Sequence, residues 1–124
     1  MSYTEQGRNI TLPANADLSS SQYLFVDCNS TGRVAVVAGN GYKAVGVLQN
    51  KPAAIDRAAT VQFDGVTKVK AGAAVAKGAD IMSNATGQAI TATTGLVSQG
   101  TALEAATAAN QLISVLLKSN GTVV

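Results

Sequence analysis

The sequence predicts an all-β protein: a compact β-sandwich or barrel-like domain that follows an extended amino-terminal arm. Short apolar runs alternate with turn residues along most of the chain. An Asp-Gly pair at residues 64–65 separates two β-prone runs. Residues 46–63 and 100–115 share one pattern of glycine, strand, small-residue connection and alternating strand. The chain of 124 residues is one domain by length, enough to bury about two-thirds of its unfolded surface.

Residues 1–21 differ from the rest of the chain, since they are polar, contain Pro13 and end in three serines. Only residues 10–12 have an extended pattern. The sequence therefore predicts an arm over residues 1–21 and a β-rich domain over residues 22–124. Two alternatives remain open for the arm: a loosely ordered terminus, or a segment that orders on a neighbouring subunit.

The first half of the domain contains strand candidates separated by turn residues. Apolar runs predict strands at 23–26, 33–38, 44–48 and 60–63. Turn clusters at 29–32 and 39–41 separate the first three, and Lys51-Pro52 ends the third because proline cannot donate to a ladder. The Asp-Gly pair predicts a hairpin between 60–63 and a strand at 66–70.

The second half is predicted by comparison with the first. Residues 72–80 form a small-residue connection, and short strands at 81–82 and 88–91 flank a turn at 84–87. Residues 101–110 have helical propensity because alanine, leucine and glutamate are good helix formers. The similarity to residues 46–63 instead predicts a strand, a connection and a further strand from residue 111.

Composition predicts a core of small side chains, since 47% of residues are hydrophobic but only 4% are aromatic. Such a core is modestly stabilising, so association with further copies or a partner is expected to add stability. The nine basic residues are scattered and the net charge is +2, which argues against nucleic acid as a partner. No apolar run approaches the roughly 20 residues of a membrane span, so no membrane contact is expected. The single cysteine, Cys28, excludes an intramolecular disulfide and is expected to be a small buried residue at a strand end.

Catalytic chemistry finds little support in the sequence. The chain lacks histidine, which removes the usual general base and the common zinc ligand. Four aspartates lie in or beside predicted turns, where this residue caps its own backbone: Asp27, Asp56, Asp64 and Asp80. No enzymatic activity, catalytic residue, cofactor or metal site is therefore predicted.

The order of small-residue motifs resembles that of the capsid cement, or decoration, proteins of tailed phages. The resemblance covers residues 32–117 and rests on the order and spacing of six motifs. They are Ala44-Val45-Gly46-Val47-Leu48, Gly65-Val66-Thr67-Lys68-Val69, residues 71–80 (AGAAVAKGAD), Asn84-Ala85-Thr86-Gly87, residues 100–106 (GTALEAA) and Leu112-Ile113-Ser114-Val115-Leu116.

This resemblance implies a β-rich subunit on the outer surface of an expanded icosahedral phage head. The partner would be the major capsid protein, and a homotrimer would sit at threefold and quasi-threefold positions. Several modest contacts on one rigid trimer would act together against the pressure of packaged DNA. The protein would be assembled in the host cytoplasm and located in the virion.

Contact residues are not fixed by the family, so the candidates come from this chain. Tyr3, Ile10 and Leu12 are the apolar residues of the arm that we expect to contact the capsid. A loop with Lys51, Pro52, Ile55 and Arg57 is either a subunit interface or a solvated surface. A virion fibre or adhesin module for host glycans is the alternative function, although the only aromatic residues are Tyr3, Tyr23, Phe25, Tyr42 and Phe63.

Overall fold

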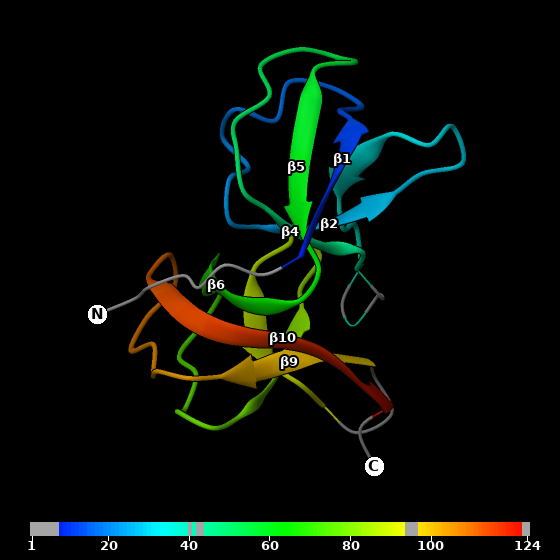
Figure 1. The fold of residues 1–124 in the computed structure, drawn as a ribbon. Coiled ribbons are helices and arrows are strands. Elements are labelled where there is room, and N and C mark those ends of the chain that lie inside the picture. The colour runs from blue at the N-terminus through cyan, green and yellow to red at the C-terminus, as the bar shows by residue number, and fades with distance from the viewer. Residues whose placement is uncertain (1–7, 40, 42–43, 94–96, 123–124) are drawn as a thin grey trace.

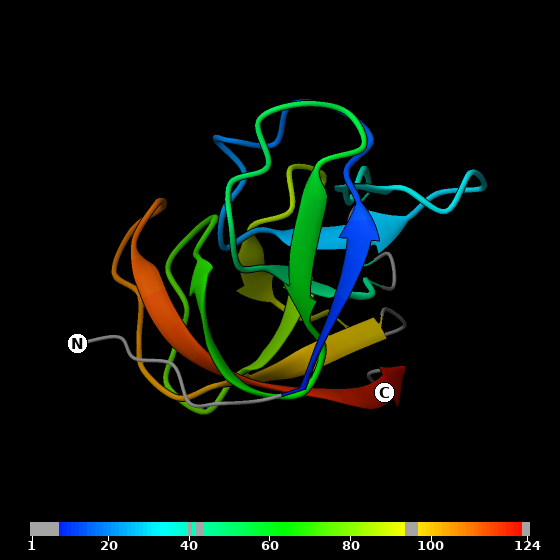
Figure 2. The same ribbon diagram turned by 45° about the horizontal axis from the view of Figure 1, so that its top comes forward.

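The computed structural model describes residues 8–39, 41, 44–93 and 97–122, which form ten strands and no helix. Figure 1 shows two layers, and Figure 2 shows the long β10 curving across the lower one. Both sheets have five strands and all their strand pairs are antiparallel. The predicted all-β fold is confirmed, and no described segment is a helix long and apolar enough to span a membrane.

The first sheet contains β1 to β5 and the second contains β6 to β10. The first has the order β1-β5-β4-β2-β3 and is formed by β1 (Asn9–Pro13), β2 (Phe25–Cys28), β3 (Val34–Val36), β4 (Gly46–Leu48) and β5 (Ala58–Gln62). The second has the order β6-β10-β9-β7-β8 and is formed by β6 (Gly65–Lys70), β7 (Asp80–Ser83), β8 (Ala89–Thr91), β9 (Val97–Ala102) and β10 (Leu112–Thr122).

The two sheets are repeats of one arrangement. Adding five to each strand number of the first sheet gives the strand order of the second. The turns repeat as well: the side-chain oxygen of Asn29 accepts hydrogen bonds from the backbone of Thr31 and Arg33. Asn84 does the same for Thr86 and Gln88. The predicted likeness between residues 46–63 and 100–115 therefore extends over both halves of the domain.

The helical propensity of residues 101–110 is overridden by pairing, as the comparison of the two halves predicted. The strand β9 ends at Ala102, and the connection that follows contains no helix. Ala106 is buried, and its backbone exchanges two hydrogen bonds of 2.9 Å with Val75. These bonds fix an extended bridge where isolated propensity would favour a helical turn.

The predicted hairpin at Asp64-Gly65 is wrong. Gly65 has the expected positive φ of 88°, but β5 pairs with β1 and β4 while β6 pairs with β10. The turn therefore carries the chain from one sheet to the other. The buried Gln62 holds this turn, because its side-chain nitrogen donates to the backbone oxygens of Asp64 and Val66.

The segment predicted as an arm is part of the first sheet from Asn9 onward. In β1, Ile10 lies opposite Val61 and Leu12 lies opposite Ala59 of β5. Further along, Ala14 and Leu18 are 0% and 6% exposed. The described part of the arm thus packs within its own chain, and the predicted boundary after residue 21 does not coincide with a change in packing. This packing is favourable because β1 gives β5 a hydrogen-bonded neighbour and the segment adds apolar side chains to the core.

The core consists mainly of valine and alanine, as composition predicts. One cluster joins the two sheets and includes Phe25, Val47, Val69, Ile81 and Val115. A second cluster belongs to the first sheet and the segment before β2, with Ala14, Leu18, Val26, Val34, Leu48, Ala59 and Val61. The prediction that Cys28 is buried is wrong, because it is exposed at the last position of β2, where the strand leaves the core.

Candidate functional site

The carboxylates of the described residues mostly serve the fold. Within that part of the chain no three His, Cys, Asp or Glu side chains could hold a metal ion together. Asp64 pairs with Arg8 at 3.0 Å and Asp56 pairs with Arg33 at 2.8 Å. The hydrogen bond from Arg33 holds the pKa of Asp56 below its usual range. These groups stabilise turns and strand ends, so the candidate site is a surface.

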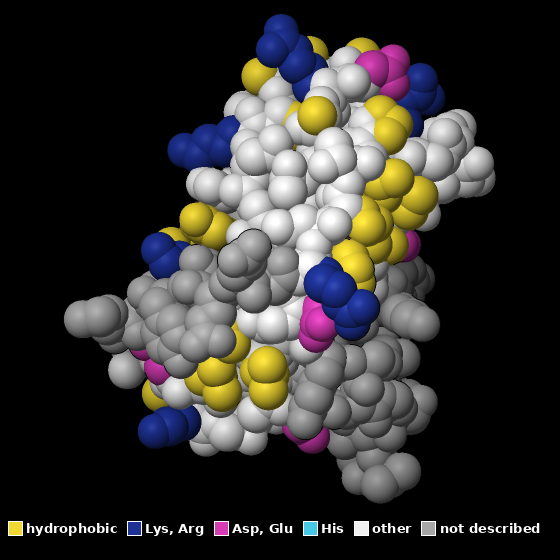
Figure 3. Space-filling view, in the orientation of Figure 1, with side chains coloured by type: hydrophobic (Ala, Val, Ile, Leu, Met, Phe, Trp, Pro, Cys, Tyr) yellow, Lys and Arg dark blue, Asp and Glu magenta, His cyan; other side chains and the backbone are white. Residues whose placement is uncertain are grey.

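The strand β1 lies at an edge of the first sheet and carries part of an apolar surface patch. Ile10 on β1 and Phe63 just after β5 are each 37% exposed. The guanidinium carbon of Arg8 lies 5.5 Å from the centre of the Phe63 ring. Figure 3 shows hydrophobic side chains along this edge of the upper layer. We call Arg8, Ile10, Leu12 and Phe63 the β1 edge surface.

The predicted capsid-contact residues differ in exposure. Ile10 is exposed, whereas Leu12 is partly buried and packs against the second core cluster. Tyr3 lies outside the described residues. Of the two described candidates, Ile10 therefore exposes more of its side chain to a partner than Leu12 does. Leu12 contributes mainly to the core.

The predicted interface loop connects β4 to β5 and ends beside β1. Pro52 is buried, and its backbone oxygen accepts a hydrogen bond of 2.7 Å from Leu18, so it holds the loop. Ile55 is 55% exposed and Arg57 is also exposed. The backbone of Ala14 is hydrogen-bonded to Asp56 and Arg57, each at 2.8 Å. The structure thus brings Ile55 and Arg57 close to the end of β1.

Three surface residues of interest were not predicted. Arg8 and Phe63 complete the β1 edge surface, and Leu112 is a 39% exposed apolar residue at the start of β10. Phe63 had a signal in the sequence: it follows the alternating strand but precedes a turn, where the sheet no longer covers it. The sequence contains no signal for the pairing of Arg8 with Asp64, because the two residues are 56 positions apart.

The described residues form a two-sheet body with apolar side chains exposed at the β1 edge. The sequence matches the model of the phage cement protein family over residues 4–118, and the chain belongs to this family. It is therefore a structural protein of the phage particle, and the family gives no support to catalysis. The resemblance noted in the sequence is confirmed. No curated protein matches the chain with significance.

Among solved structures, the fold is similar to the N base of head fiber gp8.5 in bacteriophage phi29. The TM-score is 0.70 at 15% sequence identity, with 94% of this chain and 98% of that chain covered. At this identity the likeness concerns the fold. It shows that nearly the whole chain has the architecture of a solved protein structure.

Proposed function

We propose that the protein binds the outer surface of an expanded icosahedral phage head and cements neighbouring major capsid proteins against internal DNA pressure. Its membership of the phage cement protein family carries this proposal, because the match at residues 4–118 spans both sheets. The module would act as a homotrimer at threefold and quasi-threefold positions. Its contacts would then be multivalent, so that modest single contacts hold together.

The β1 edge surface is the proposed capsid contact. Ile10 and Phe63 offer apolar area, and Arg8 adds a cation over an aromatic ring. In the strand order β1 is the neighbour of β5, and directly after β1 Ala14 bridges Val34 of β3. The outward backbone groups of β1 before this bridge are proposed to bind a partner by strand addition. Ile55 and Arg57 are proposed as the nearby contact between subunits.

Binding to expanded capsids that lack the protein tests this function. Cys28 is exposed and is the only cysteine, so it accepts one fluorescent label. We expect saturable co-sedimentation with expanded heads and a higher temperature of DNA release from decorated heads. A labelled protein with an intact fold that stays in the supernatant would refute the proposal.

A head-fibre or adhesin module is the second candidate, favoured by the similarity of the fold to a head fiber base. Such a base would bind heads without raising the temperature of DNA release. Few aromatic rings of the described residues are accessible to a glycan. Phe25 is fully buried, Arg8 lies over the Phe63 ring, and Tyr23 is half-buried before β2. A specific signal on a glycan array would favour the adhesin function.

A further inference from the structure

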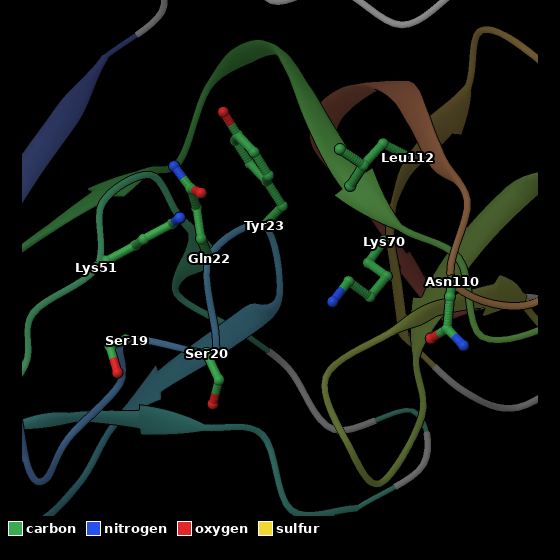
Figure 4. A pocket seen from close by; sticks show the side chains of 8 residues that line it. All are labelled: Ser19, Ser20, Gln22, Tyr23, Lys51, Lys70, Asn110 and Leu112. Atoms are coloured by element: carbon green, nitrogen blue, oxygen red, sulfur yellow. The ribbon is translucent and has the colours of Figure 1, made fainter.

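A pocket of about 360 Å³ lies where the two halves of the domain meet. Four separate segments form it: the connection before β2, the connection from β4 to β5, the end of β6 and the start of β10. Its lining residues are Ser19, Ser20, Gln22, Tyr23, Lys51, Lys70, Asn110 and Leu112. Figure 4 shows Lys51 and Lys70 entering from opposite sides, with Gln22 and Tyr23 between them.

The backbone conformation of Tyr23 indicates that its aromatic side chain has a role beyond the fold. Tyr23 has a positive φ of 66°, which is unfavourable for a bulky residue. The repeat identifies Gly78 as its counterpart, with a φ of 86°. Tyr23 donates from its backbone nitrogen to Leu48 and Gly78 donates to Ala102, both at 2.8 Å. Where the second half has the residue that suits this conformation, the first half places an aromatic ring in a pocket.

The pocket has an excess of positive charge. Lys51 and Lys70 form no ion pair within the described part of the chain, and no carboxylate lines the pocket. The ammonium of Lys68 lies 6.0 Å from the centre of the Tyr23 ring and adds a third cation nearby. The nearest carboxylate in sequence, Asp17, already accepts a hydrogen bond of 2.9 Å from the backbone of Ser19.

Apolar and hydrogen-bonding groups accompany these cations. The Tyr23 ring and the 39% exposed Leu112 supply apolar surface. The hydroxyls of Ser19 and Ser20 can donate hydrogen bonds. The side-chain oxygen of Asn110 accepts from Gln88 at 2.9 Å, which leaves its amide hydrogens for a ligand. The lining therefore suits a carboxylate with an apolar neighbour.

We propose that this pocket binds an acidic peptide segment of the major capsid protein. One Asp or Glu carboxylate of that segment would lie between Lys51 and Lys70, and an adjacent apolar side chain would contact Tyr23 and Leu112. This inference rests on the proposed function and names a second contact with the same partner, separate from the β1 edge surface.

A second copy of this chain could also supply an acidic group to the pocket. The positive net charge of the chain disfavours this source. The whole chain carries a net charge of +2 with only seven acidic residues. Several of these are already engaged: Asp56 and Asp64 in ion pairs, and Asp17 and Asp27 with backbone nitrogens. A different protein is therefore the better donor of the carboxylate.

Capsid binding by single lysine variants tests the pocket. Lys51→Gln and Lys70→Gln are compared with Lys77→Gln, which removes the same charge from an exposed residue outside the pocket. Each pocket variant is expected to weaken binding by about threefold per site, and further where several sites bind together. The Lys77 variant should stay within about twofold of the wild type, as expected for a surface charge without a partner. Binding of the wild type should weaken with added salt more steeply than that of the pocket variants.

The outcomes separate the two proposals. A wild type that fails to bind refutes the proposed function. Equal binding by the wild type and all three variants, each with an unchanged melting temperature, overturns the pocket and leaves the function standing. A changed solution mass of the pocket variants, with unchanged capsid binding, identifies a second copy as the occupant and overturns the capsid assignment.

A titration followed by amide NMR shifts gives a readout independent of capsids. The probe is the blocked dipeptide acetyl-Glu-Leu-amide, with acetyl-Gln-Leu-amide and sodium phosphate as controls. We expect saturable shifts at Tyr23 and Leu112 with the glutamate peptide only. Shifts of equal size with phosphate would show a general anion site and refute the peptide, as would equal shifts with the glutamine peptide.

Discussion

Among the residues that the structure describes, three other than glycine have a left-handed backbone: Tyr23, Asp56 and Asn110, with φ of 66°, 66° and 71°. Asp56 and Asn110 are counterparts in the repeat, because Asp56 donates to the backbone of Ala14 and Asn110 donates to Ala71. Their residue types tolerate this conformation through short polar side chains. Tyr23 does not, so it is the described position with the least favourable match between residue type and backbone.

Substitution of Tyr23 should separate the cost of its backbone from the value of its ring. Tyr23→Gly and Tyr23→Ala both lose the ring, but only alanine keeps the left-handed cost of about 1 kcal/mol. The glycine variant is therefore expected to be the more stable by about 1 kcal/mol in urea unfolding. Gly78→Ala is the matched control and should lose a similar amount, since a methyl group there would meet no atom within 4 Å. Equal stability of the two Tyr23 variants would contradict the strain at this position.

The ion pair of Asp56 with Arg33 predicts a contribution to acid stability. The hydrogen bond from Arg33 lowers the pKa of Asp56 in the folded state. The pair therefore stabilises the fold above the unfolded pKa of about 4, and this effect disappears as the pH falls through the folded value. Asp56→Asn keeps a residue that tolerates the backbone, as Asn110 shows in the second half.

Melting temperatures from pH 7 to pH 2 measure this effect. The wild type should be more stable than Asp56→Asn at pH 7, and the two should converge at the acid end. Asp80→Asn serves as the control, because Asp80 forms no ion pair with any described residue. A difference between wild type and Asp56→Asn that stays constant with pH would show that charge is not its cause.

At the scale of elements, the repeat explains two glycines that turn geometry does not. Gly46 in β4 and Gly100 in β9 occupy equivalent positions, and a methyl group at either would meet a backbone oxygen of the neighbouring strand. These oxygens belong to Gln62 and Leu116, which are counterparts in β5 and β10. Each half thus needs glycine where two strands approach closely.

Gly46→Ala and Gly100→Ala are therefore expected to destabilise the protein by about 3 kcal/mol or more, since the backbone has to move. Chemical denaturation of both variants and of Gly32→Ala measures this. Gly32 has a positive φ of 79° and open space around it, so its substitution should cost only about 1 kcal/mol. Similar losses in all three variants would contradict the close approach. If Gly46→Ala and Gly100→Ala do not fold, their soluble yields are compared with that of Gly32→Ala instead.

Local signals in the sequence predicted most elements but not how they join into sheets. The turns at Asn29 and Asn84 and the strands beside them follow from short-range chemistry that neighbouring residues fix. The Asp-Gly pair correctly predicted a positive φ at Gly65 but not the strand pairing. The strand β6 pairs with the distant β10 and does not form a hairpin with β5. Likewise, polarity suggested an arm before residue 21, while the pairing of β1 with β5 depends on a strand about 50 residues away.

The site was less predictable than the fold, for a reason that belongs to the whole molecule. A contact surface has no fixed motif, and its exposure results from packing between distant segments. Pro52 lies in a loop but is buried, with its backbone oxygen bonded to Leu18, whereas Phe63 directly follows a strand and stays exposed. The pocket joins residues from 19 to 112, so only the assembled halves reveal it.

The size of the exposed surface bears on how the protein associates. The chain exposes 5995 Å², close to the roughly 6,200 Å² expected for a compact monomer of its 12.5 kDa mass. The core is thus closed within one chain, despite its small side chains. We therefore predict that the protein is a folded monomer in dilute solution and that trimers form on the capsid, where its local concentration is high.

Mass measurement alone and with expanded capsids tests this prediction, and Ile55→Glu identifies the contact. Ile55 is 55% exposed, so a glutamate there should leave the melting temperature nearly unchanged. It would place a charge in the proposed contact between subunits, so the loss of cooperativity in capsid binding is expected to be large. Ala85→Glu adds the same side chain at an exposed position of the β7–β8 turn and should bind as the wild type does. A stable dimer both in solution and on capsids would contradict the threefold arrangement, and equal cooperativity of the two variants would remove Ile55 from the interface.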